Sequence, residues 1–144
     1  MRWRHPVLII GLMWALTSVA AAAEEAGVSI RDAWVREAPP GATMMAGYMV
    51  LKNNTPRSQV LVAARSSGFG TVMIHRTVVK GGLTGMEHAP KIELLPNASL
   101  LFEPGGYHLM LLNPKRALHA GDRVDINLEF LGGLVIPVVY EVRK

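Results

Sequence analysis

Alternation of hydrophobic and polar residues is the clearest pattern in the second half of the chain. Between residues 123 and 130, hydrophobic positions alternate with polar ones: Val124, Ile126, Leu128 and Phe130 against Arg123, Asp125, Asn127 and Glu129. Because successive side chains of a β-strand point to opposite faces, this pattern predicts a half-buried antiparallel strand. Gly132-Gly133 follows it. The glycine pair predicts a tight hairpin into a last strand.

Similar hydrophobic runs recur at short intervals from residue 28 onward, each bounded by Gly, Pro or Asn. No long run after residue 23 has the 3.6-residue period of a helix. This spacing predicts an all-β sandwich or barrel. The predicted strands are Val28–Arg36, Met45–Lys52, Gln59–Ala64, Thr71–Val79, Leu83–Glu87, Lys91–Leu94, Ser99–Phe102, Tyr107–Leu111, Arg123–Phe130 and Val135–Arg143. Trp34, the only tryptophan after residue 23, is expected to anchor the core.

The N-terminus has a different pattern, with Arg2 and Arg4 before an uncharged run from Val7 to Ala23. A basic head, a short apolar middle and a small-residue end are typical of a secretory signal peptide. The run is short for a membrane span, which takes about 20 apolar residues. We therefore expect a cleavable signal peptide over residues 1–23, one domain over residues 24–144, and no stable membrane insertion after cleavage.

Charge and cysteine content narrow the chemistry. Without Arg2 and Arg4, 13 basic residues face 11 acidic ones, a net charge of +2, which gives little reason to expect nucleic-acid binding. The chain has no cysteine. Disulfides, thiolate zinc sites, iron–sulfur clusters, blue-copper centres and lipid attachment to cysteine are therefore not expected. The remaining chemistry depends on His, Met or carboxylates.

One candidate pair of ligands is His108 and Met110, which follow the turn Pro104-Gly105-Gly106. Two residues apart on a strand, they share a face and lie about 7 Å apart. Leu109 and Leu111 then point to the other face, toward the core.

A second pair comes from the predicted hairpin at Gly81-Gly82. If these glycines form its loop, His75 lies opposite His88, and Met86 lies opposite Thr77. His75 and Met86 are then diagonal neighbours, about 7–8 Å apart. Two imidazoles and two thioethers without a thiolate favour Cu(I), since thioethers select this soft cation.

The spacing of these four residues resembles that of a known family. His75, Met86, His108 and Met110 match the H-x₁₀-M-x₂₁-H-x-M motif of the periplasmic Cu(I) chaperones called PCu(A)C. Flanking segments match too: Asp32–Arg36, Pro39–Gly41, Gly47–Met49, Pro104–Leu111 and Leu118–Asp122. The resemblance covers nearly all of the chain after the signal peptide.

The resemblance implies a cupredoxin-like Greek-key β-sandwich that binds one Cu(I) per chain through those four residues near the surface. It also implies a periplasmic metallochaperone rather than an enzyme. Its copper would go toward the dinuclear centre of cytochrome c oxidase subunit II, together with a Sco-type thioredoxin-like copper protein. These properties are expectations from the family.

Other His and Met residues have less certain roles. His88 is either an auxiliary ligand, because the hairpin places it on the site face, or a solvated residue before Pro90. Arg76 should point away from the site. One further methionine is expected to line the rim of the site, the rest being packing residues: Met44, Met45, Met49 and Met73.

Three functions stay open at this stage. The first is the Cu(I) metallochaperone. The second is a copper buffering or resistance protein that uses the same site without a dedicated acceptor. The third is a non-metal β-sandwich for carriage or adhesion, in which the His and Met positions are incidental. No general base is evident for catalysis.

Overall fold

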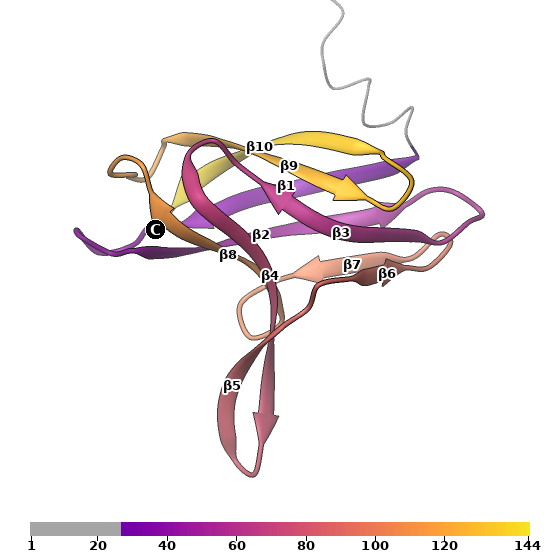
Figure 1. Cartoon of the computed structure of the whole chain (residues 1–144), viewed down its shortest axis with the longest axis horizontal. Coiled ribbons are helices and arrows are strands. Elements are labelled where there is room, and N and C mark those ends of the chain that lie inside the picture. The colour runs from indigo at the N-terminus through magenta and orange to yellow at the C-terminus, as the bar shows by residue number, and fades with distance from the viewer. Residues whose placement is uncertain (1–26) are drawn as a thin grey trace, which may run out of the picture.

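Ten β-strands and no helix make up residues 27–144, the part of the chain that the computed structural model describes (Figure 1). The predicted signal peptide lies outside these residues. Within residues 27–144, no helix is long and apolar enough to span a membrane. The strands are β1 Val28–Arg36, β2 Met44–Asn53, β3 Gln59–Arg65, β4 Phe69–Lys80, β5 Leu83–His88, β6 Ile92–Leu94, β7 Ser99–Phe102, β8 Tyr107–Pro114, β9 Arg123–Phe130 and β10 Val135–Arg143.

All ten predicted strands are present, with small differences at their ends. The largest difference is at β8, which was expected to end at Leu111 and continues to Pro114. Asn113 takes a φ of 53°, and Pro114 pairs with Phe69 at the start of β4. Proline is tolerated where a strand ends, so Asn113-Pro114 forms the end of β8 instead of a loop after it.

The strands form one hydrogen-bonded sheet in the order β5-β4-β8-β7-β2-β1-β10-β9-β3-β6. Most neighbours are antiparallel, whereas β1 pairs with β10 and β7 with β8 in parallel. The sheet folds over so that β3 lies against β4, and a single core fills the space inside. The expected all-β sandwich is confirmed. The distal half of β4 and all of β5 project from the body as a two-stranded arm (Figure 1).

The core is built by alternate residues of opposing strands. Leu109 and Leu111 of β8 are completely buried, as predicted, and belong to the same core cluster as Ile126 and Leu128 of β9. The predicted alternation of β9 is confirmed, since its hydrophobic positions are buried and its polar ones are exposed or half-buried. Such burial is the main source of stability in a domain of this size.

Trp34 is a correction to the sequence prediction. It is half-buried and packs against Tyr48, with ring centroids 4.7 Å apart and the rings tilted by 42°, rather than lying in the core. The pairing of β1 with β2 shifts between Arg31 and Trp34. Such a bulge reverses which face the following residues occupy, so Val35 enters the core and Trp34 turns outward.

Asn53 is a buried polar residue at the end of β2. Its amide nitrogen donates to the carbonyl oxygens of Arg57, Leu94 and Leu95 at 2.7, 3.1 and 3.2 Å. Its side-chain oxygen accepts from the backbone nitrogen and the hydroxyl of Thr55 at 3.0 and 2.7 Å. One side chain thus holds the end of β2, the next turn and the end of β6 together.

Candidate copper site

β8 places His108 and Met110 on the outer face of the sandwich. Leu109, between them, is fully buried on the inner face, so the predicted alternation is confirmed. His108 is only 5% exposed. Met110 is half-buried. A polar ring with so little exposure requires an explanation, because buried polar atoms normally have hydrogen-bond partners.

The β4–β5 hairpin has the predicted register. His75 pairs with His88, and Thr77 pairs with Met86. Gly81 and Gly82 both have positive φ angles, 57° and 77°, which suit a two-residue hairpin turn. His75 and Met86 therefore lie on the same face of the arm, as diagonal neighbours.

The opposite face of the arm is charged. Arg76 pairs with Glu87 across the hairpin, and the two side chains are 3.6 Å apart. Lys80 donates a hydrogen bond to the same carboxylate. The expectation that Arg76 points away from the site is therefore confirmed, and its charge does not face the imidazoles.

Three imidazoles form a row across β5, β4 and β8. His75 pairs with His108 as well as with His88. The ring centroid of His75 is 5.9 Å from that of His108 and 5.7 Å from that of His88. An imidazole nitrogen binds a metal at about 2.0–2.1 Å, so two rings that share an ion have centroids about 5–6 Å apart. Both separations fit that range.

Two ring nitrogens in this row have no hydrogen-bond partner. His75 Nδ1 and His108 Nε2 are both buried and unpaired among the residues that the structure describes. His108 Nδ1 lies 3.2 Å from the carbonyl oxygen of Gly106. A carbonyl can only accept, so Nδ1 carries the proton and the lone pair is left on Nε2. Such a carbonyl–imidazole contact is the usual support of a metal-binding histidine.

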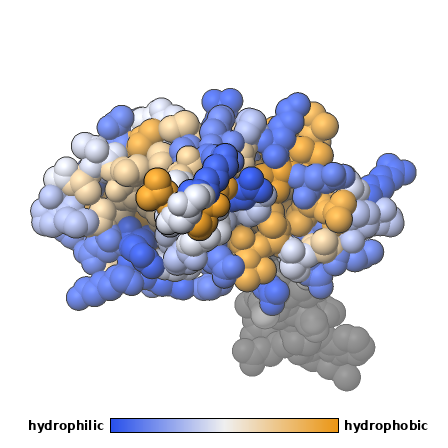
Figure 2. Space-filling view, turned by 90° about the horizontal axis from the view of Figure 1, so that it is seen from below, coloured by the Kyte–Doolittle hydropathy of each residue, from blue (hydrophilic) through white to orange (hydrophobic). Residues whose placement is uncertain are grey.

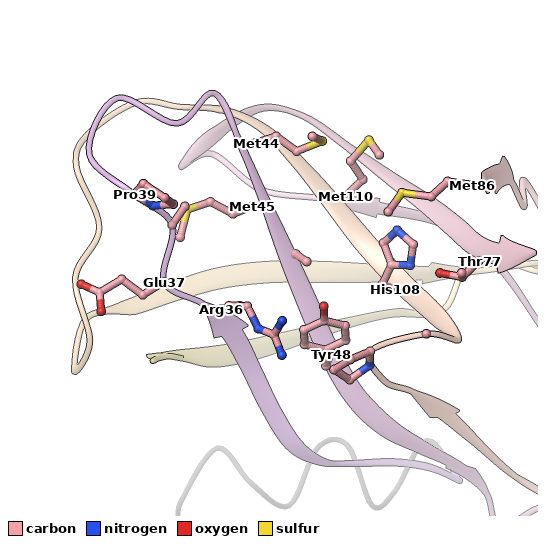
Figure 3. Close-up of a pocket in the computed structure, with 14 residues that line it drawn as sticks. Arg36, Glu37, Pro39, Met44, Met45, Tyr48, Thr77, Met86, His108 and Met110 are labelled. Atoms are coloured by element: carbon pink, nitrogen blue, oxygen red, sulfur yellow. The ribbon is translucent and has the colours of Figure 1, made fainter. Parts of the chain in front are cut away.

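A pocket of about 390 Å³ opens beside His108. Met86, His108 and Met110 line it, and the side chain of Met44 lies beside them in the same lining (Figure 3). The pocket therefore brings together three of the four predicted ligands. His75 is not in its lining, but lies next to His108 in the row of imidazoles.

Met44 takes the place of the further methionine expected at the rim. It is 50% exposed and lines the pocket, whereas Met45 and Met49 are 6% and 1% exposed. Tyr48 and Arg36 also line the pocket and were not expected there. The pairing of Ala46 with Met110 brings β2 beside β8, and this long-range pairing is not visible in the sequence pattern.

The ligand types available limit the ion. Within residues 27–144, no group of three or more His, Cys, Asp or Glu side chains is placed to hold a metal. The pocket offers the thioethers of Met86 and Met110 beside the imidazole of His108. Thioethers and imidazoles without thiolate or carboxylate suit Cu(I) better than zinc, calcium or magnesium.

Burial lowers the pKa of His75 below its usual 6.5, and the nearby His108 and His88 imidazoles lower it further. The folded protein therefore takes up this proton less readily than the unfolded chain. The stability that depends on neutral His75 is complete above about pH 6.5, and it is lost as pH falls through the folded-state pKa.

We expect the metal-free protein to lose stability between pH 7.5 and 5.5 more steeply than a His75→Gln variant. The effect should be small because the imidazole is only half-buried. Urea unfolding at three pH values measures it. Equal pH dependence in the two proteins would contradict the role of His75.

Comparison with known proteins supports the fold and gives the family. The profile of the family described as "Putative lipoprotein LpqE-like" matches residues 28–142. The chain is 32% identical over 142 residues to "Putative lipoprotein Lxx21020" of Leifsonia xyli subsp. xyli (strain CTCB07), which covers 94% of this chain and 84% of that protein.

Solved structures with the same fold include copper proteins. The solution structure of CuI-DR1885 from Deinococcus radiodurans has a TM-score of 0.67 and 31% identity, covering 85% of this chain and 86% of that one. The copper-bound PCuAC domain from PmoF2 has a TM-score of 0.69 and 22% identity, covering 81% and 92%. These matches confirm the predicted cupredoxin-like sandwich.

Proposed function

The chain belongs to the LpqE-like family, and on this premise we propose that it binds one Cu(I) ion and transfers it to an acceptor as a metallochaperone. The proposed ligands are His75, Met86, His108 and Met110. The observation that carries the proposal is the buried, unpaired Nε2 of His108 beside the thioethers of the pocket. The relative whose structure was solved with Cu(I) supports the choice of metal.

The chemistry of the site supports transfer rather than catalysis. Neutral imidazoles and thioethers leave a bound Cu(I) with a charge of about +1, without a carboxylate to hold it firmly. Met86 is 61% exposed, so an incoming ligand can approach the ion from that side. An acceptor would displace the thioethers one after another. The protein would then be a carrier and not an enzyme.

The acceptor and the compartment are part of the proposal. The resemblance to PCu(A)C proteins favours the periplasm. It also favours cytochrome c oxidase subunit II as the acceptor of copper and a Sco-type protein as a second partner in its delivery. The lipoprotein name of the family also favours export. The arm exposes Met86 beside the pocket and Val79 and Leu83 toward its tip, and the view toward its end shows hydrophobic atoms among hydrophilic ones (Figure 2). This mixed surface suits a transient contact with another protein.

Anaerobic titration with Cu(I) against a chromogenic Cu(I) chelator tests the proposal. We expect the protein to retain one equivalent. Failure to compete with the chelator would leave the non-metal β-sandwich for carriage or adhesion as the function. Mixing the loaded protein with the soluble domain of subunit II separates the other two. Transfer of copper supports the chaperone, and retention supports the buffering protein.

A further inference from the structure

His88 lies at the outer end of the row of imidazoles and takes no part in the pocket. It is the last residue of β5, is exposed, and pairs with His75 on the same face of the arm. On the other side of His75 is the buried His108. The row therefore leads from the protein surface to the candidate site.

His75 is placed to bind one metal ion together with either His88 or His108. Its centroid distances to His88 and His108 are nearly equal, 5.7 and 5.9 Å, and both suit two imidazoles on one ion. Its Nδ1 atom is buried and has no partner within the described residues. The His75 ring could therefore turn toward His88 or toward His108 without breaking a hydrogen bond of that nitrogen.

A thioether, that of Met73, also lies beside His88. Met73 precedes His75 by two residues on β4, so both point to the same face. Met73 and His88 line one hollow of about 100 Å³, separate from the larger pocket. Imidazole and thioether together again make a set that suits Cu(I).

We propose that His88, His75 and Met73 form an outer docking position for Cu(I), from which the ion passes to the inner site. This inference rests on the proposed function and adds a route to it. In the transfer, the bonds from copper to His88 and Met73 break as the bonds to His108, Met86 and Met110 form, and His75 stays bound. Copper remains Cu(I) throughout, so no oxidant or reductant is needed. One ion per chain remains the number held tightly.

Loading kinetics of the full protein test this route. His88→Gln is compared with His119→Gln. His119 lies between β8 and β9, and its side chain is 73% accessible. Loading is followed by stopped flow from a Cu(I)–chelator complex, and affinity by competition with the same chelator. We expect His88→Gln to keep the wild-type affinity within about twofold and to load at least about fivefold more slowly. Met73→Leu, which preserves volume, should also load slowly.

Three results would overturn the inference in different ways. Wild-type loading rates in both His88→Gln and Met73→Leu would remove the outer position and leave the proposed function intact. A tenfold or greater loss of affinity in His88→Gln would make His88 a ligand of the inner site instead. If the wild-type protein retained no Cu(I), the proposed function would be wrong, and the route would be wrong with it.

Discussion

The double substitution His108→Ala, Met110→Ala is expected to abolish retention of Cu(I) against the chelator. It removes the buried lone pair of His108 Nε2 and one of the thioethers of the pocket. Loss of two of four ligands should weaken binding at least about 100-fold, or about 2.8 kcal/mol. The measurement is the same anaerobic competition as for the wild-type protein.

A matched control is His119→Ala, Leu131→Ala, which removes one imidazole and one hydrophobic side chain from exposed positions. This control should keep the wild-type affinity. Circular dichroism establishes that both double variants are folded. If the two variants bound Cu(I) equally well, the ligands would have to be sought elsewhere in the chain.

The Asn53→Asp substitution is expected to destabilise the fold more than any surface change. The new carboxylate would have the shape of the amide but could not donate to the carbonyl oxygens of Arg57, Leu94 and Leu95. Asn53 has no exposed surface, so water cannot replace those bonds. A buried group without partners costs about 1–3 kcal/mol, and more when it is charged. We expect a loss of about 3 kcal/mol in urea unfolding.

Asn54→Asp is the natural comparison because the same change occurs one residue along. Asn54 is exposed, and its amide donates only to the Ser29 hydroxyl at 3.1 Å. Its substitution should change the free energy of unfolding by less than about 0.5 kcal/mol. Equal effects at the two positions would show that the Asn53 hydrogen bonds contribute little to stability.

These two asparagines also show what the sequence could predict. Local patterns were sufficient for the strands and for the hairpin register, since alternation and Gly81-Gly82 are local signals. The sequence marks residues 53–56 as a turn, but it does not tell which asparagine is buried. That depends on β6, which contributes Leu94 from 41 residues away.

For the site too, local signals could be predicted and long-range neighbours could not. The four ligand candidates came from residue type, spacing and resemblance, and the structure places His75 beside His108. The places of Met44 and Tyr48 depend on β2 lying beside β8, and such long-range pairing leaves no periodic signal. Trp34 was placed in the core from its residue type alone, whereas the face that it occupies depends on the bulge in β1.

The arm gives the pocket a mechanical property. Met86 reaches the pocket from the projecting hairpin, whereas His108 and Met110 belong to β8 in the body. An ion bound between them would act as a cross-link, fastening a hairpin that is weakly supported on its own. A partner that bound the arm and bent it would draw Met86 away from His108 and Met110 without disturbing the core. Retention of the ion and its release would then be governed by separate parts of the molecule.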